Sequence, residues 1–258
     1  MRRLLRGLYI GASGMLLELR RTETIANNLA NAATNGYKRD ELVEEAFPAI
    51  FLHRFNDQTG LAYGPPAYPA PVGQLGLGAA AVETVSDLAA GPLTETRNPL
   101  DLALTGEGWF AVQTPNGVRY TRDGAFTRDA QGLLVTEGGY PVLGEQGPLT
   151  LPAGAVEVGP DGTVAVEGQI SGRLRLARFA PGTRLVKEGD NLFLAGGPEQ
   201  PLDPGTAVRQ GFIERSNVNT VREMIGLIAS VRSYEAHQKL IQAQDELLQK
   251  TVNEVGRV

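Results

Sequence analysis

Residues 7–39 read GLYIGASGMLLELRRTETIANNLANAATNGYKR. In this stretch, apolar or small residues recur in alternating steps of four and three, which is the spacing along one face of a heptad helix. These positions are Leu8, Ala12, Met15, Leu19, Thr22, Ala26, Leu29 and Ala33. Asn35 and Gly36 tolerate a positive φ angle, so we expect the helix to end there. The stretch predicts a long helix with one apolar face that needs a partner.

A second heptad pattern occupies the C-terminal end of the chain. Its positions step by three and four residues, and they are Met224, Leu227, Val231, Tyr234, Gln238, Ile241, Asp245, Leu248, Val252 and Val255. Ser216, Asn217 and Asn219 are good N-cap residues just before this pattern. Glu223 lies early in the pattern, where a carboxylate favours the helix dipole. We predict a second and longer helix.

Between the two patterns, strand-like runs alternate with turn signals. Asn116-Gly117, Asp123-Gly124 and Asp161-Gly162 are dipeptides typical of hairpin turns. The runs WFAVQT and VRYTR flank one of these turns, and a further turn is expected at residues 129–132. Residues 61–78 are rich in Pro, Gly and Ala and are typical of an extended connector. The middle of the chain is therefore predicted to be a β-domain.

The predicted fold class is α+β, with discontinuous terminal helices forming a coiled-coil-like core domain and a central, mainly antiparallel β-domain. We divide the chain into an N-terminal core helix at 1–36, a connector at 37–78, the central β-domain at 79–212 and a C-terminal core helix at 213–258. Each helix seam gains about 0.8 kcal/mol per CH₂ group that it buries. The available partners are the other terminal helix and neighbouring copies, so we expect the termini to become ordered on assembly.

Composition excludes several classes of function. The chain of 258 residues has 24 basic and 29 acidic residues and no basic run that could follow a track of phosphates, which argues against nucleic acid as a partner. It has no cysteine, so neither disulfides nor thiolate metal sites are possible. No apolar run reaches 18 residues, and charged residues interrupt the apolar N-terminus. We expect neither a cleaved signal peptide nor direct membrane insertion.

Three asparagines, Asn27, Asn28 and Asn31, lie within five residues of the first helix. Asparagine is a mediocre helix former, so this cluster suggests side chains that form hydrogen bonds across a helix interface. A plain amphipathic helix with polar outer positions is the alternative interpretation. The residues alone do not choose between the two.

Three blocks of the sequence resemble a known family. Residues 25–39, IANNLANAATNGYKR, resemble the N-terminal signature of the flagellar hook and basal-body rod protein family. Residues 100–144, which begin LDLALTGEGWFAV, resemble its central β signature, and residues 211–257, which begin GFIERSNVN, resemble its C-terminal block. The blocks occur in the order typical of the family. The length fits the rod types with a single β-domain, namely the distal rod protein or its proximal relative.

The resemblance implies a structural subunit of the bacterial flagellar basal body, located where the rod crosses the periplasm or cell wall. It implies polymerisation into a tube that transmits torque and conducts exported subunits, with the paired terminal helices inside and the β-domain outside. The implied partners are further copies of the chain, other rod and hook proteins, and the flagellar type III export apparatus. We expect the assembly interface to include Leu8, Met15, Leu19, Asn27, Asn28, Leu29, Asn31, Met224, Leu227, Val231, Tyr234, Ile241, Leu248 and Val252.

Two other classes of function are considered. A pair of carboxylates among Asp101, Glu107 and Asp123 could act on a glycan, but all three are expected in turns, Glu107 and Asp123 beside glycines, and there such side chains bind their own backbone. The two histidines, His53 and His237, show no metal-ligand spacing, and His237 is expected on a solvated helix face. We therefore expect no catalytic residue, cofactor or metal. A coiled-coil adaptor or secretion chaperone would share the heptads but would not need the β signature.

Overall fold

The computed structural model describes residues 2–53 and 71–255. The chain divides into two compact units. One, called the helix unit here, comprises Met1–Ala26, Glu41–Val85 and Met224–Val258. The other, the β unit, comprises Asn27–Asp40 and Ser86–Glu223. Each unit is described by itself.

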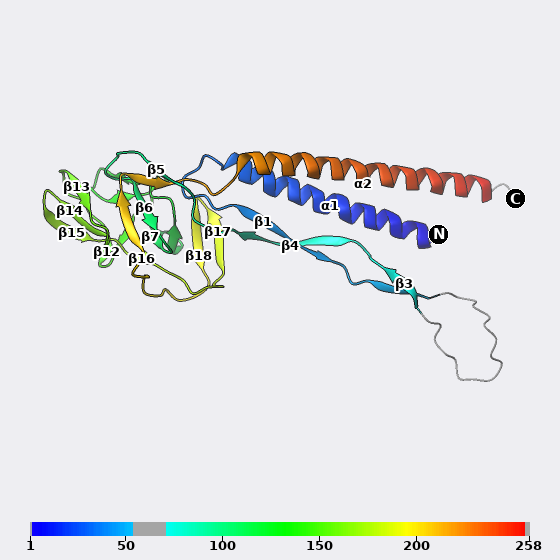
Figure 1. Cartoon of the computed structure of the whole chain (residues 1–258), viewed down its shortest axis with the longest axis horizontal. Coiled ribbons are helices and arrows are strands. Elements are labelled where there is room, and N and C mark those ends of the chain that lie inside the picture. The colour runs from blue at the N-terminus through cyan, green and yellow to red at the C-terminus, as the bar shows by residue number, and fades with distance from the viewer. Residues whose placement is uncertain (1, 54–70, 256–258) are drawn as a thin grey trace, which may run out of the picture. The chain divides into compact units, whose positions relative to one another are not determined.

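The structure confirms the predicted α+β class, with a helix at each end and antiparallel strands between them (Figure 1). The first elements of the chain are α1 (Arg2–Ala30), β1 (Asp40–Ala46), β2 (Ile50–His53), β3 (Pro71–Leu75) and β4 (Ala79–Ser86). Those of the β unit are β5 (Leu93–Glu95), β6 (Leu102–Thr105), β7 (Trp109–Thr114), β8 (Gly117–Thr121), β9 (Thr127–Arg128), β10 (Leu134–Val135), β11 (Leu143–Gly144), β12 (Gly147–Pro148), β13 (Val156–Val158), β14 (Thr163–Val166), β15 (Gln169–Arg173), β16 (Leu176–Ala177), β17 (Leu185–Gly189), β18 (Leu192–Ala195), β19 (Ala207–Gln210) and β20 (Phe212–Glu214). The last element is α2 (Thr220–Val255).

Within the helix unit, α1 and α2 lie side by side and run in opposite directions (Figure 1). A Cβ atom on Gly7 would meet the side chain of Gln244, and one on Gly14 would meet His237. At the other end of the pair, Gly226 lies against Ile25. Both predicted helices are present, and they pair within a single chain. That they become ordered only on assembly stays a prediction.

The end of α1 differs from the sequence-based expectation. The α-helix ends at Ala30, and tighter turns follow, in which the amide of Ala32 donates to the carbonyl of Leu29 and that of Thr34 to Asn31. Gly36 does adopt the expected positive φ, at 65°. Its amide donates to the carbonyl of Glu214 over 2.8 Å. Because the chain must reach this acceptor in β20, regular helix stops before the Asn-Gly pair.

The start of α2 agrees with the sequence. Asn219 caps the helix, because its Oδ1 accepts a 3.0 Å hydrogen bond from the amide of Arg222. Glu223 lies in the first turn, as expected for a carboxylate that favours the helix dipole. Asn217 has a different role from the one expected, since its Oδ1 accepts from the amide of Arg39 over 2.7 Å.

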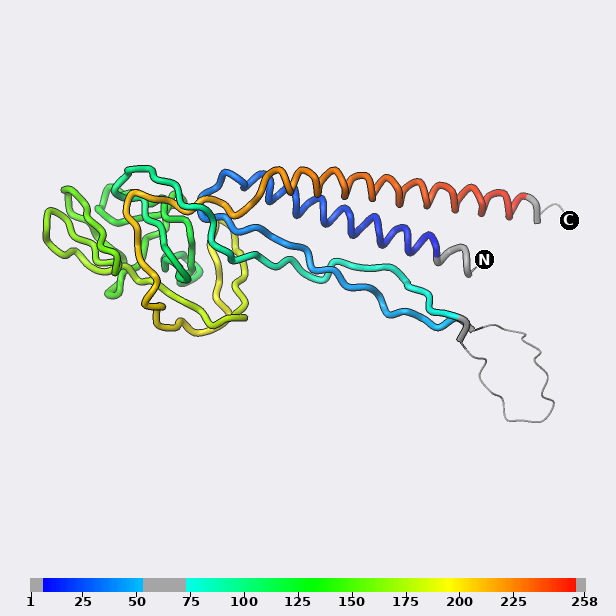
Figure 2. Tube along the Cα trace, viewed as in Figure 1, coloured from blue at the N-terminus to red at the C-terminus, as the bar shows by residue number. Residues whose placement is uncertain are grey.

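The predicted connector contains regular structure. β1 pairs with β4, and β2 pairs antiparallel with β3 in the register Ile50↔Leu75. Figure 2 follows the two arms of this ribbon in the helix unit. Residues 61–70 of the expected extended connector lie outside the described residues. No turn dipeptide in the described part marks the pairing, so local sequence reasoning missed it.

The β unit contains a five-stranded sheet in the order β16-β7-β8-β18-β17 and a three-stranded sheet in the order β13-β14-β15. The hairpin expected around Asn116 is confirmed, since Thr114 pairs with Gly117. The turn expected at residues 129–132 is also present between β9 and β10. By contrast, Asp123-Gly124 is not a tight hairpin turn. A Cβ atom on Gly124 would lie 1.6 Å from the carbonyl oxygen of Leu102, so glycine is needed here for close backbone contact.

The β unit has two apolar clusters. The larger one is formed by Leu102, Leu104, Phe110, Val112, Phe126, Leu134, Val142, Leu149, Leu151, Val164, Val166, Leu174, Leu192 and Val208. The smaller one is formed by Trp109, Ala111, Tyr120, Leu143, Ala177, Phe179 and Phe193. Residues of β7 and of β18 contribute to both, because successive side chains of a strand point to opposite faces of a sheet. These two strands of the five-stranded sheet therefore link the two cores.

A buried ion network also lies in the β unit. The side chains of Lys38, Glu214 and Arg122 are 0%, 1% and 5% exposed. Lys38 Nζ lies 2.5 Å from one oxygen of Glu214, and Arg122 Nη1 lies 3.2 Å from the other. Lys38 also donates to the carbonyl of Ala89, and the amide of Gly91 donates to Glu214. Burial lowers the pKa of Lys38, and the adjacent carboxylate of Glu214 opposes that shift.

This network predicts a large effect of removing its only carboxylate. In Glu214→Ala, Lys38 and Arg122 would be buried cations without a counter-ion, so we expect the free energy of unfolding of the β unit to fall by about 3–5 kcal/mol. Trp109 is the single tryptophan and is buried in this unit. Its fluorescence during urea unfolding measures the change.

Two variants control this experiment. Glu95→Ala removes the carboxylate of an exposed pair with Arg97 and should change stability by less than about 1 kcal/mol. Lys38→Met leaves Glu214 paired with Arg122 and should cost less than Glu214→Ala. An equal loss in Glu214→Ala and Glu95→Ala would show that the network does not carry the stability assigned to it.

Candidate assembly site

The contact between α1 and α2 uses small residues. A Cβ atom on Gly11 would lie 2.9 Å from Ile241 Cγ1, and the corresponding positions on Gly7 and Gly14 are also occupied by side chains of α2. These glycines let the two helix backbones approach closely. Of the expected seam on α1, Leu19 is exposed, and Leu8 and Met15 are only half-buried. The face of α1 that meets α2 is thus displaced by one residue from the predicted one.

A polar contact lies in the middle of the helix pair. Ser230 is buried, and its hydroxyl donates to the Glu18 carboxylate over 2.7 Å. Thr22 Oγ1 lies 3.0 Å from the same hydroxyl, and Arg21 forms an ion pair with Glu18 at 3.0 Å. Because a buried carboxylate needs hydrogen-bond donors, this group favours one register of α1 against α2.

The expected interface residues of α2 fall into two groups. Leu227, Tyr234, Ile241 and Leu248 are half-buried. Met224, Val231 and Val252 are exposed. The half-buried group includes Ile241, which faces Gly11. The exposed group is 42–57% accessible in the described structure, and its role in assembly stays a prediction.

The exposed apolar surface of the helix unit is larger than the sequence indicated. On α2 it includes Ile225 and Ile228 beside Met224 and Val231. The spacing of these four residues places them on one face of the helix. On α1, Tyr9 and Leu16 are exposed, and they line an apolar groove of about 510 Å³ together with Ile10, Ala12, Ser13, Phe47 and Leu77. Exposed apolar patches of this kind mark interaction surfaces.

The asparagine cluster binds the chain that follows α1. Asn28 is fully buried, its Nδ2 donates to the carbonyl of Asp40, and its Oδ1 accepts from the amide of Asp40, each over 2.8 Å. Asn27 Oδ1 accepts from the hydroxyl of Tyr37 over 2.9 Å, and Asn31 donates back to the Asn27 carbonyl. In the described residues, these bonds stay within residues 27–40, and a contact of the cluster across an interface between copies stays a prediction. Leu29, from the same expected set, is half-buried.

Further polar contacts hold residues 37–40 in the β unit. Lys187 Nζ donates to the carbonyl of Lys38 over 2.8 Å and to Asp40 over 2.9 Å, and it lies 3.9 Å from the ring centre of Tyr37. Arg39 Nε pairs with Glu223 at 2.6 Å. Burial is the largest cause that raises the pKa of Tyr37, and Asp40 adds to it. Sequence reasoning missed this arrangement, because Lys38 and Lys187 look like surface residues.

The carboxylates considered for catalysis have structural partners. Asp101 accepts a hydrogen bond from Asn98, and Glu107 forms an ion pair with Arg178 at 3.0 Å. Asp123 Oδ1 accepts from the amide of Ala125, as expected for a side chain that binds its own backbone. Burial raises the pKa of Asp123 to about 6.

The two histidines, the groups that could bind a metal and the hydropathy of the helices were also predicted from the sequence. His237 is half-buried over Gly14, which corrects the expectation of a solvated helix face. His53 ends β2. Across residues 2–53 and 71–255, His, Asp and Glu form no group of three or more that could hold a metal ion. No helix in that part of the chain is long and apolar enough to cross a membrane.

Three family models match successive parts of the chain. Residues 8–38 match "Flagella basal body rod protein", residues 103–166 match "Flagellar hook protein FlgE/F/G D1 domain", and residues 209–254 match "Flagellar basal body rod FlgEFG protein C-terminal". The matches coincide with α1 and its following turn, with much of the β unit, and with α2.

Curated relatives match over nearly the whole chain. The chain is 34% identical to the flagellar basal-body rod protein FlgG of Buchnera aphidicola subsp. Schizaphis graminum, with 94% of this chain and 97% of the relative covered. It is also 34% identical to flagellar basal-body rod protein FlgF of Caulobacter vibrioides, with coverage of 97% and 98%. FlgG of Bacillus subtilis is 34% identical, with coverage of 97% and 99%. Sequence identity therefore does not show whether the chain is more similar to FlgG or to FlgF.

The glycine seam predicts opposite effects of two similar substitutions. Gly226→Ala should raise the thermal stability of the helix pair, because the new Cβ lies at an ordinary 3.4 Å from Ile25 and alanine favours helix by about 1 kcal/mol. Gly11→Ala should lower it, because overpacking against Ile241 costs about 1–3 kcal/mol. Thermal melts followed by far-UV circular dichroism compare the two. Equal stabilisation by both would contradict the close contact at Gly11.

The raised pKa of Asp123 predicts a pH dependence. Folding favours its protonated form, so its contribution to stability is present below the ordinary pKa of 3.8 and is lost as pH rises through about 6. Asp123→Asn keeps the acceptor for Ala125 and should exceed the natural chain in stability by about 2 kcal/mol above neutral pH. This advantage should vanish in acid, as measured by urea unfolding across the pH range.

Asp161→Asn provides a control of opposite sign. Asp161 is exposed, and hydrogen bonds from Thr163 lower its pKa. Its contribution to stability is therefore present above the ordinary pKa and is lost in acid, so the amide should lower stability at neutral pH. If Asp123→Asn lowers stability there as well, burial does not control the pKa of Asp123.

Proposed function

The chain belongs to the flagellar hook and basal-body rod protein family, and from this premise we propose that copies of it polymerise through their helix units into a tube. The chain is a structural subunit of the flagellar basal-body rod. Its proposed roles in the tube are to transmit torque and to conduct exported subunits. Its other partners there are rod and hook proteins.

The exposed apolar stripe of α2 carries this proposal. Met224, Ile225, Ile228 and Val231 are exposed on one face of a helix whose other face contacts α1. A side chain of this size gains about 1.5–3 kcal/mol when it is fully buried. A stripe of four such residues therefore favours contact with another subunit. The apolar groove lined by Tyr9 and Leu16 offers a second surface of the same kind.

We further propose that the chain has no catalytic activity and leaves the cytoplasm through the flagellar type III export apparatus. The structural partners of Asp101, Glu107 and Asp123 support a structural role for these carboxylates. The folded β unit and its family match disfavour the alternative of a coiled-coil adaptor or secretion chaperone.

A single charge on the stripe tests the assembly role. Ile228→Asp should abolish or strongly reduce swimming, because a carboxylate buried between subunits costs several kcal/mol. The fluorescence of Trp109 should show an unchanged β unit. Swimming in soft agar and recovery of the chain in isolated basal bodies are the measurements.

Lys239→Asp is the matched control. Lys239 is also exposed on α2, beyond the apolar stripe, so the same carboxylate there should leave swimming nearly intact. Normal swimming of the Ile228→Asp strain would contradict an assembly contact at the stripe. Absence of the natural chain from isolated basal bodies would contradict the proposed function as a whole.

A further inference from the structure

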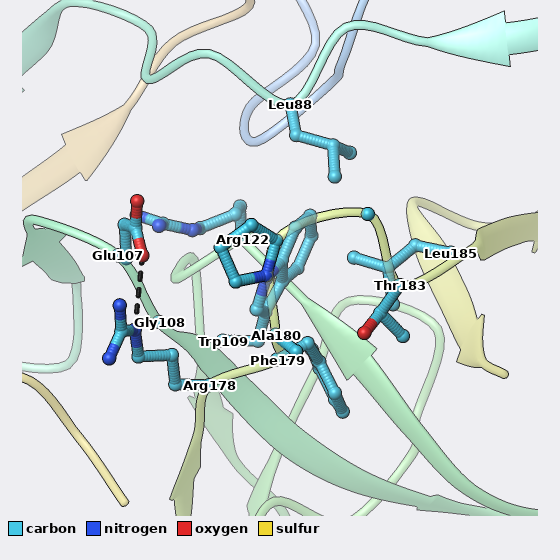
Figure 3. A pocket seen from close by; sticks show the side chains of 12 residues that line it. Leu88, Glu107, Gly108, Trp109, Arg122, Arg178, Phe179, Ala180, Thr183 and Leu185 are labelled. Atoms are coloured by element: carbon cyan, nitrogen blue, oxygen red, sulfur yellow. Dashed lines mark hydrogen bonds and ion pairs between the residues drawn. The ribbon is translucent and has the colours of Figure 1, made fainter. Parts of the chain in front are cut away.

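Many polar side chains of the β unit have partners within the chain. Figure 3 shows one example at the edge of a pocket, where Arg178 pairs with Glu107 at 3.0 Å. Arg122, in the same view, pairs with the buried Glu214. Asn116 is different, because it is exposed and its side-chain amide forms no hydrogen bond within the described residues. This amide is therefore able to turn towards its own backbone.

The glycine that follows Asn116 determines what its amide can do. The backbone nitrogen of the next residue can attack the side-chain carbonyl carbon, Cγ, of an asparagine. The attacking nitrogen gives its proton to the departing NH₂ group, which leaves as ammonia, and a succinimide ring remains. Water then opens the ring at either carbonyl carbon and leaves aspartate or isoaspartate. Glycine favours the attack, because it has no Cβ atom to crowd the nitrogen and it permits many backbone angles.

The chain has two Asn-Gly pairs, and the pair at Asn35 is held by distant parts of the sequence. Gly36 is buried, and its amide donates to the carbonyl of Glu214 over 2.8 Å. The side chain of Asn35 is also bound, because its Oδ1 accepts from Arg215 over 3.3 Å. Both groups that would react are thus held by tertiary hydrogen bonds. The reaction at Asn35 requires that these bonds open first.

The other pair, Asn116-Gly117, lies at the end of the β7–β8 hairpin. Gly117 is half-buried and pairs with Thr114, the last pair of this ladder. A Cβ atom on Gly117 would meet only Arg119 Nη1, at 3.6 Å. The end of a hairpin opens at a lower free-energy cost than a buried tertiary contact. The nitrogen of Gly117 is therefore released more readily than that of Gly36.

We propose that Asn116 is a site of spontaneous deamidation in the folded chain, and that Asn35 is protected from the same reaction. The nitrogen of Gly117 attacks Cγ of Asn116, ammonia leaves, and water is the only co-reactant. Either product places a carboxylate, which is ionised at neutral pH, at the tip of the hairpin. The proposal goes beyond the proposed function and does not depend on it, since the reaction takes place within the β unit of one chain.

Isoaspartate at this position would alter the hairpin itself. Two residues separate Thr114 from Gly117, and the length of such a turn fixes the register of its strands. Thr114 Oγ1 also donates to the carbonyl of Gly117 over 2.8 Å. Isoaspartate adds one carbon atom to the backbone path of this turn. Because β7 contributes to both apolar clusters, chains that carry isoaspartate should unfold at a lower urea concentration.

The rates of conversion at the two pairs test the proposal. The purified full-length chain is incubated in mildly alkaline buffer, and samples are digested with pepsin in acid and analysed by mass spectrometry. Protein isoaspartyl methyltransferase with a labelled methyl donor measures isoaspartate independently. In the folded chain, Asn116 should convert at least about tenfold faster than Asn35, because two tertiary hydrogen bonds protect Asn35. In urea, where both pairs lose their surroundings, the two rates should be similar.

Three controls accompany this comparison. Asn98 precedes Pro99, which has no N–H group, so Asn98 should not form the succinimide by this route. Asn116→Ser should remove most of the isoaspartate formed in the folded chain, whereas Asn35→Ser should leave it nearly unchanged. Fluorescence of Trp109 checks that both variants are folded. Equal rates at the two pairs in the folded chain, or undiminished isoaspartate in Asn116→Ser, would overturn the proposal.

Discussion

The Glu214 carboxylate is the group on which the β unit depends. It is the single anion between two buried cations, Lys38 and Arg122, and these three residues come from distant parts of the sequence. Lys38 follows α1, Arg122 follows β8, and Glu214 ends β20 just before α2. One carboxylate therefore holds two segments next to the end of the β7–β8 hairpin: the one that enters the β unit after α1 and the one that leaves it before α2. An apolar replacement could pack equally well, but a buried ion triad accepts fewer alternative pairings.

The asparagine cluster binds the same segment, residues 37–40, with which the chain enters the β unit. Asn28 binds both backbone groups of Asp40, and Lys187 binds the carbonyl of Lys38 as well as the Asp40 carboxylate. These bonds require the backbone path that the Lys38–Glu214 pair fixes. The polar residues 27–40 thus form one continuous arrangement within the β unit. The asparagines thus have a structural role within the chain, and a role in contacts between copies stays a prediction.

Local sequence patterns correctly predicted those elements whose formation depends on interactions between neighbouring residues. Heptad spacing located both helices, and turn chemistry located the β7–β8 hairpin, because both effects act over a few residues. The β2–β3 ribbon was missed, because no turn signal joins its strands in the described residues. The buried Lys38 was also missed, since lysine looks like a surface residue and its partner is 176 positions away. Such pairs are decided by tertiary contact, which one sequence does not display.

The intrachain contact of α1 lies one residue away from most of the predicted seam, and the part of that seam in contacts between copies stays a prediction. The predicted seam combines Leu8, Met15 and Leu19 with smaller residues, whereas the contact with α2 uses Gly7, Gly11 and Gly14. Larger side chains such as Leu16 and Ile228 are left exposed. Glycine contributes little apolar area, so intrachain pairing uses only part of the apolar surface available. The α2 side chains Met224, Ile225, Ile228 and Val231 are 42–63% exposed, so further burial would gain part of the about 1.5–3 kcal/mol that full burial of each is worth. Small residues thus pair the helices within a chain, while large apolar side chains of both helices stay exposed.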